Sequence, residues 1–264
     1  MRLAALDPYA LALLRGPLQA CGTLVVLLLL YRGRTPQAFR ALGPAGLALC
    51  LLYGLGNLLF LLALDSTSVA NVMVFIATIP LFAALFGRTL LGERLPGRTW
   101  TAIGLALAGI GVVAGRSLGE PTLAGDSAAV AAALCFALFF VLVRRRPEVD
   151  VIPAVVLAGL LYPLLALPFL TGAALAALAA LGAEQLLWIG LDGLLVLPVA
   201  YACIVTGPRY LPAAEVGLLL LLETLLGPLW VWLALGEAPP ATTLLGGGIV
   251  LATLAWHSLA VGRR

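Results

Sequence analysis

The sequence predicts an all-α polytopic membrane protein, built as an inverted repeat of five-helix units with nine membrane spans present. Three observations lead to this prediction. The composition is strongly apolar, a series of apolar runs is long enough to cross a bilayer, and the first part of the chain has an internal copy displaced by an offset that takes Leu91 to Leu235.

The composition determines the class of protein. The 264-residue chain is 63% hydrophobic and only 10% charged. A soluble domain has about a quarter of its residues charged, so this chain cannot solvate its surface in water, and lipid must surround it. All 15 basic residues are arginine, and the net charge of +3 is too small to indicate a nucleic-acid partner. The four cysteines show neither metal-ligand nor disulfide spacing.

Nine apolar runs have about the 20-residue length that crosses the hydrocarbon core. The first starts at Asp7-Pro8, which has the form of an N-cap followed by proline at the first helical position. It extends through Leu30, and Tyr31-Arg32-Gly33-Arg34 ends it. The other predicted spans are 41–63, 67–89, 98–115, 123–143, 151–171, 184–205, 212–235 and 241–261. Pro80 is expected to interrupt the helix in 67–89. The connections are short, so no soluble domain is expected.

The internal copy relates residues 63–115 to residues 209–259. The same offset superimposes Leu91-Gly92-Glu93 on Leu235-Gly236-Glu237 and Gly104 on Gly248. The predicted units are 1–118, with four helices, and 119–264, with five, because the counterpart of the 123–143 span falls before residue 1. A unit of five helices is odd, so the two copies must face opposite ways in the membrane. Inverted repeats are typical of secondary transporters that work by alternating access.

The arginines orient the predicted bundle. If the loop after the first span is cytoplasmic, only Arg2 and Arg116 lie on the outer side. The cytoplasmic side then carries Arg32, Arg34, Arg40, Arg88, Arg94, Arg98, Arg144, Arg145, Arg146, Arg209, Arg263 and Arg264. This asymmetry follows the positive-inside rule and predicts a cytoplasmic C-terminus, in a plasma membrane of the bacterial inner-membrane type.

Several short motifs occur in the same order along the chain. They are Thr67-Ser68-Val69-Ala70-Asn71, Pro80-Leu81-Phe82, Leu91-Gly92-Glu93, the glycine-rich stretch 104–115, Glu223 and Leu235-Gly236-Glu237. Together they resemble the EamA-like drug/metabolite transporter (DMT) superfamily. The resemblance implies ten helices in two five-helix repeats, and export of small organic metabolites. The first helix of that ten-helix pattern is the one expected before residue 1.

The chemistry is expected at the few polar groups at membrane depth, because burying a charge in lipid is costly. Arg15 and Asp192 each lie roughly 12 Å from the outer end of their spans. We expect them to pair, or to bind jointly the carboxylate and amine of a zwitterion. The alternative is a structural ion pair that joins two helices.

Further candidates come from the other spans. Glu223 lies near the midplane and is a candidate for proton coupling, or else a protonated glutamate hydrogen-bonded within the bundle. Asn57 maps by the repeat offset onto Tyr201, and midplane sites form at such related positions. The complete set of expected substrate-binding residues is Arg15, Tyr53, Asn57, Asp192, Tyr201, Glu223 and Trp230.

Two features are interpreted as structural. Glu93 is expected to form a loop-fixing ion pair with the arginines near it in the sequence, Arg88, Arg94 and Arg98. The stripe Gly104, Ala108, Gly111 and Gly115 allows close approach of another helix, either within the chain or in a homodimer.

These residues favour transport over catalysis. The single histidine, His257, and the lack of a Cys/His cluster or phosphate loop argue against an enzyme, a metal site or a cofactor. We expect a permease that moves a small organic metabolite, amino-acid-like, outward by alternating access. The alternative is a transport-inactive membrane scaffold or partner subunit related to such transporters.

Overall fold

A computed structural model of the protein describes residues 7–31, 33–114, 122–235 and 241–261, and these residues form helices and turns without a strand. The helices are α1 (Pro8–Tyr31), α2 (Thr35–Arg40), α3 (Gly43–Ser66), α4 (Val69–Ile76), α5 (Ile79–Leu91), α6 (Gly97–Ala114), α7 (Leu123–Arg145), α8 (Val151–Ala166), α9 (Gly172–Ala179), α10 (Ala183–Leu191), α11 (Leu197–Thr206), α12 (Ala213–Leu235) and α13 (Ala241–Val261). A π-helical segment, Asp192–Val196, joins α10 to α11. Single 3₁₀ turns follow α8 (Leu167–Phe169) and α11 (Gly207–Arg209).

The all-helical architecture is confirmed, and it is consistent with a polytopic membrane protein. Each predicted span coincides with one long helix or with a series of successive helices. Six helical stretches are long and apolar enough to cross a membrane, namely Pro8–Tyr31, Gly43–Ser66, Val69–Leu91, Leu123–Arg145, Val151–Phe169 and Ala183–Arg209. The described parts of the chain contain three shorter apolar helices, Gly97–Val113, Ala213–Leu222 and Ala241–His257. The total of nine spans remains a prediction.

Local signals in the sequence explain several helix boundaries. The side chain of Asp7 accepts hydrogen bonds from the backbone amides of Tyr9 and Ala10, and α1 starts at Pro8 as predicted. The span containing Pro80 is interrupted between α4 and α5, with the proline in the first turn of α5, where its missing N–H costs no hydrogen bond. Gly92 ends α5 in a left-handed conformation with φ of 69°, which glycine adopts without steric cost.

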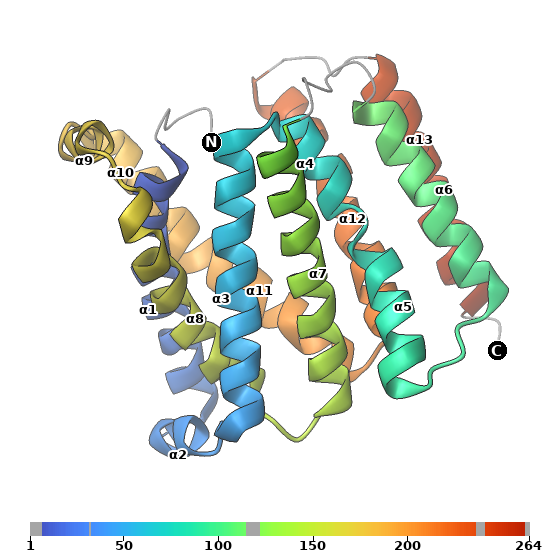
Figure 1. The fold of residues 1–264 in the computed structure, drawn as a ribbon, viewed down its shortest axis with the longest axis horizontal. Coiled ribbons are helices and arrows are strands. Elements are labelled where there is room, and N and C mark those ends of the chain that lie inside the picture. Colours follow the sequence, from blue (N-terminus) through green and yellow to red (C-terminus); the bar gives the residue numbers. More distant parts are fainter. Residues whose placement is uncertain (1–6, 32, 115–121, 236–240, 262–264) are drawn as a thin grey trace.

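The helices pack as a bundle with α3 near its centre (Figure 1). The α3 helix lies between α7 on one side and α8 on the other, and α1 packs against α8 and the π segment. At one edge of the bundle, α6 and α13 form a pair of their own (Figure 1). The largest group of buried side chains spreads from α3 and α7 to α5, α6 and α12.

Two helix pairs approach very closely through glycine. A Cβ on Gly16 of α1 would lie 2.7 Å from the carbonyl oxygen of Gly159 in α8, and a Cβ on Gly109 of α6 would lie 2.9 Å from the carbonyl oxygen of Gly246 in α13. Contacts of Cβ atoms this short do not occur, so both positions require glycine for the observed packing.

The predicted stripe on α6 does not make that contact. Among the residues that the structure describes, a Cβ on Gly104 or Gly111 would meet no atom within 4 Å, so these residues face away from the described neighbouring helices. Of the two alternatives left open by the sequence, packing within the chain is therefore not supported for Gly104 and Gly111, because the packing of a helix and not its glycine spacing sets its rotation. The homodimer alternative stays a prediction.

The turn after α5 is held by an ion pair, as predicted, but with another partner. Nε of Arg144, at the end of α7, donates to Oε1 of Glu93 at 3.0 Å. The same arginine donates to the backbone carbonyl of Arg209, and Arg209 donates to the backbone carbonyl of Val149. These contacts connect the α5–α6 turn with the ends of α7 and α11 at one end of the bundle.

Candidate functional site

An ion pair joins α1 to the π segment. Nε of Arg15 donates to Oδ2 of Asp192 at 2.8 Å, and the two side chains are 28% and 40% exposed. The predicted pairing of these two residues is confirmed. Five N–H groups are available on a guanidinium, and this bond uses one of them.

The backbone around Asp192 explains why the carboxylate is presented there. Pro198 follows in the first turn of α11, and proline has no N–H to donate to the carbonyl four residues earlier. The backbone widens into a π-helix over Asp192–Val196, in which the amide of Leu197 donates to the carbonyl of Asp192, five residues earlier. Single π-helical turns of this kind occur frequently at functional sites.

Small residues bring α1 against this irregular segment. A Cβ on Gly193 would lie 2.7 Å from Cβ of Leu18, and a Cβ on Gly22 would lie 2.5 Å from Cγ of Pro198. The backbones therefore meet closely on both sides of the ion pair. This close approach fixes the position of Arg15 relative to Asp192.

Tyrosine rings extend the site from the ion pair toward α3. Tyr201 on α11 and Tyr162 on α8 lie close enough to Arg15 to interact electrostatically with it. The Tyr53 and Tyr201 rings stand edge to face with centroids 5.7 Å apart. On α3, the side-chain amide of Asn57 donates to the backbone carbonyl of Tyr53 at 2.8 Å. The structure thus brings Arg15, Asp192, Tyr53, Tyr201 and Asn57 into one contiguous group.

Three polar residues in this region were not predicted. Tyr162 is buried on α8, and Gln19 and Thr23 are buried on α1. Arg15, Gln19 and Thr23 recur every fourth residue and so share one face of α1. That four-residue spacing was the available signal, but a neutral polar residue costs less in an apolar span than a charge does, so it is a weaker indication of a site.

Two expected site residues cannot be placed. Glu223 and Trp230 belong to α12, and their side chains lie outside the described residues. Their substrate-binding and proton-coupling roles stay predictions. Among the side chains that the structure describes, no group of three or more His, Cys, Asp or Glu could hold a metal ion.

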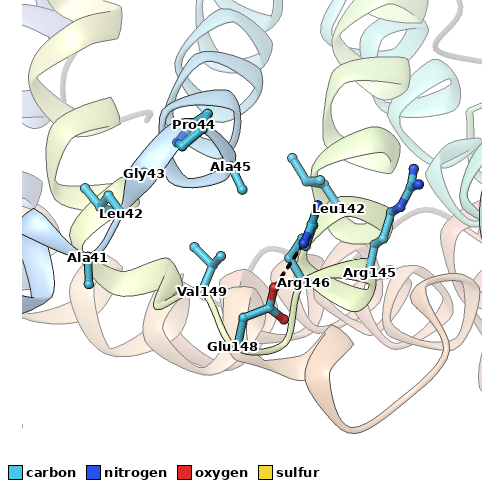
Figure 2. Close-up of a pocket in the computed structure, with 10 residues that line it drawn as sticks. All are labelled: Ala41, Leu42, Gly43, Pro44, Ala45, Leu142, Arg145, Arg146, Glu148 and Val149. Carbon is cyan, nitrogen blue, oxygen red and sulfur yellow. Dashed lines mark hydrogen bonds and ion pairs between the residues drawn. The ribbon is translucent and has the colours of Figure 1, made fainter.

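A surface hollow of about 560 Å³ lies elsewhere, at the end of the bundle where α7 turns into α8 (Figure 2). Arg146 and Glu148, two of its charged residues, bind each other at 3.4 Å. Arg145 points away from it (Figure 2). Its remaining lining residues are Ala41, Leu42, Gly43, Pro44, Ala45, Leu142 and Val149. The hollow contains none of the predicted site residues and is not the candidate site.

Comparison with known proteins identifies the family. The model of the EamA-like transporter family matches residues 1–115 and 123–259. The chain belongs to the EamA-like transporter family. This EamA-like protein is therefore a multi-pass membrane protein and a transporter of the drug/metabolite type, and membership points to a transporter rather than an enzyme.

Solved structures support the same fold for the EamA-like chain. One crystal structure of a protein superimposes with a TM-score of 0.78 at 20% sequence identity, and the alignment covers 97% of this chain and 89% of that chain. Identity this low shows the fold alone. No curated protein matches the sequence.

Proposed function

We propose that this EamA-like protein is a secondary transporter that moves a small, amino-acid-like metabolite outward across the bacterial plasma membrane by alternating access. The observation that carries the proposal is the Arg15–Asp192 pair, placed between α1 and the π segment among tyrosine rings. The arginine-rich ends of the helices, with the C-terminus, are assigned to the cytoplasm by the positive-inside rule.

The pair suits a zwitterionic ligand. An arginine binds a carboxylate through two parallel N–H groups, and Arg15 uses only its Nε toward Asp192. Asp192 offers a carboxylate to an ammonium group. A bound amino acid would exchange the internal pair for two external ones, so the charges stay matched when the substrate binds and leaves.

Helix packing supports the inverted repeat on which alternating access depends. Under the offset that takes Leu91 to Leu235, α6 corresponds to α13. Gly109 meets Gly246 and Val250, while Val113, further along α6, meets Gly246, so the two helices run antiparallel. Corresponding helices of two copies that face opposite ways in a membrane must run in opposite directions.

The first part of the test removes and exchanges the charges. Purified wild-type protein, Arg15→Ala, Asp192→Ala and the exchanged double variant are reconstituted in liposomes loaded with radiolabelled L-amino acids, and efflux is measured. Loss of one charge-assisted hydrogen bond worth about 1.5–3 kcal/mol predicts a decrease of roughly 10- to 100-fold in efflux by each alanine variant. The exchanged protein is expected to recover part of this loss.

Arg146→Ala is the matched control, since it also breaks an arginine–carboxylate pair, but an exposed one at the bundle end. It should keep wild-type efflux. Equal rates in wild type and Arg15→Ala would refute the substrate role of the pair. No efflux of any amino acid by the wild type would refute the proposed substrate class, and untargeted metabolite profiling of overexpressing and deleted cells then decides between another substrate and a transport-inactive scaffold.

A further inference from the structure

Two buried polar side chains on α1 each have an atom without a hydrogen-bond partner in the part of the chain that the structure describes. Gln19 is 2% exposed and Thr23 is 1% exposed. Among the described residues, neither Nε2 of Gln19 nor Oγ1 of Thr23 has a hydrogen-bond partner. Most buried polar groups in proteins are hydrogen-bonded, so exceptions indicate a role that an apolar residue could not fill.

The packing of α1 shows where these two side chains lie. Gly16 and Ala20 pack against α8 through Pro163 and Gly159, whereas Leu18 and Gly22 pack against the π segment and the start of α11. Successive residues of a helix are rotated by about 100°, because one turn takes 3.6 residues. Going around α1, Gln19 and Thr23 fall between the edge that touches α8 and the edge that touches the π segment.

The place where α1, α8 and α11 meet is therefore lined by polar groups. Arg15 is the first of them, and Gln19 and Thr23 follow at one-turn steps toward the arginine-rich end, about 6 Å apart along the axis. Tyr162 of α8 and Tyr201 of α11 lie close to Arg15 from the other two helices. The side chains on the α1 face are a guanidinium, an amide and a hydroxyl, and none of them carries a negative charge.

We propose that Arg15, Gln19 and Thr23 form a ladder of hydrogen-bond donors that binds the carboxylate of an organic acid or amino acid in steps, between the Arg15–Asp192 pair and the cytoplasmic end of α1. This inference rests on the proposed transport function and adds the route and the chemical group that follows it. The carboxylate leaves the guanidinium for the Gln19 amide and then for the Thr23 hydroxyl. Each step spans four residues of the helix, roughly 6 Å along its axis.

Comparison of corresponding positions indicates that packing alone does not require these polar residues. The repeat offset takes Arg15, Gln19 and Thr23 of α1 to Gly159, Pro163 and Leu167, in and just after α8. None of those side chains is polar. The three polar residues therefore occur in the first repeat only, as expected if the route runs through that unit and not through its copy.

Accessibility to a charged reagent tests the ladder without knowledge of the substrate. All four cysteines are replaced by alanine, and Gln19→Cys and Thr23→Cys are each introduced into this background. The proteins are reconstituted in liposomes and treated with an anionic or a cationic methanethiosulfonate from the side of the arginine-rich ends. Val25→Cys is the control on the same helix, since Val25 is 53% exposed and points to the outside of the bundle.

The ladder predicts that both new cysteines are modified, and that Val25→Cys, in lipid, is not. In the Asp192→Ala background, where Arg15 has lost its carboxylate partner, the anionic reagent should react about tenfold faster than the cationic one, because the guanidinium then attracts anions to the route. Adding Arg15→Ala to that background should remove this difference. Modification at neither position, or faster modification by the cationic reagent in the Asp192→Ala background, overturns the proposal.

A second pair of variants covers the case in which a cysteine variant does not fold. Gln19→Leu and Thr23→Val keep the approximate shapes and remove the donors, and we expect each to slow amino-acid efflux by about tenfold, the cost of one neutral hydrogen bond. If both keep wild-type efflux while Arg15→Ala abolishes it, the ladder fails and the proposed function stands. If the cysteines react but the wild type moves no amino acid, the substrate class fails and the polar route stands.

Discussion

Gly16 of α1 tests whether close packing against α8 holds the candidate site together. Adding one methyl group in Gly16→Ala places a Cβ 2.6 Å from Cγ of Pro163 and 2.7 Å from the carbonyl oxygen of Gly159. The proline ring is stiff, and the second contact is with the backbone of a long helix. Relief therefore requires α1 to move away from α8, and α1 carries Arg15.

The magnitude follows from two opposing effects. Overpacking a well-packed contact costs about 1–3 kcal/mol, while replacing glycine by alanine within a helix gains roughly 0.5–1 kcal/mol. Gly190→Ala is a matched control, since Gly190 lies within α10, two residues before Asp192, and its added Cβ meets no atom within 4 Å. The helix gain cancels between the variants, so Gly16→Ala should be less stable than Gly190→Ala by about 1–3 kcal/mol.

Unfolding in detergent by heat and by a denaturing detergent measures this difference. The double variant Gly16→Ala, Pro163→Ala removes the ring contact but keeps the contact with the Gly159 carbonyl. Because Pro163→Ala alone restores a backbone N–H inside α8, the double variant is compared with Pro163→Ala, and its loss should be smaller than that of Gly16→Ala against wild type but not zero. Equal stability of Gly16→Ala and Gly190→Ala would refute the close approach of α1 and α8, and with it the geometry that places Arg15 against Asp192.

Two further predictions concern buried and surface polar pairs. Thr99→Val removes the hydroxyl that lies 3.2 Å from Nε2 of buried His257, and it should lower the free energy of unfolding by about 1–3 kcal/mol. Thr101 lies on the same helix but is exposed, so Thr101→Val should lower the free energy of unfolding by less than about 0.5 kcal/mol, the usual range for surface changes. Glu93→Gln weakens the partly exposed pair with Arg144 and should cost at most about 1 kcal/mol at low salt. That small loss should disappear at high salt, and a loss of several kcal/mol at any salt concentration would contradict screening by solvent.

The fold class was predictable because membrane insertion depends on averages over many residues. About 20 apolar residues in succession have few alternatives to a spanning helix, and local signals such as Asp7 and Gly92 then set boundaries to within a residue or two. The Arg15–Asp192 pair was also predictable, since two opposite charges at one membrane depth are costly apart and are expected to meet.

What the sequence could not predict depends on helix rotation and on distant partners. Gly109, which lies outside the predicted stripe, contacts α13, whereas Gly104 and Gly111 of the stripe meet no described neighbour, because packing selects the face of the helix. Glu93 binds Arg144, which is 51 residues away, rather than an arginine of its own loop. The residue pattern within one helix predicts neither the face that meets another helix nor an ion-pair partner in a distant segment.

Gln19 and Thr23 illustrate the same limit for function. A neutral polar residue in an apolar run is compatible with a packing role or with a ligand contact, and only burial without a partner distinguishes the two cases. Charged residues are identified earlier in a sequence because their cost in lipid is larger. Neutral site residues are therefore the ones that sequence reasoning misses first.

The close packing around Gly16 and the open hydrogen-bonding capacity of Gln19 and Thr23 have a common consequence for selectivity. Small residues on α1 and α8 exclude lipid from the seam, so each buried donor without an acceptor there costs about 1–3 kcal/mol. A ligand regains that energy only if it brings an acceptor, and a carboxylate forms hydrogen bonds roughly twice as strong as neutral acceptors do. An amine without a carboxylate brings no acceptor, so the Gln19 amide and the Thr23 hydroxyl would stay unpaired. We therefore expect substrates that share a carboxylate but differ in their side chains to compete with one another for efflux, whereas the corresponding amines should not.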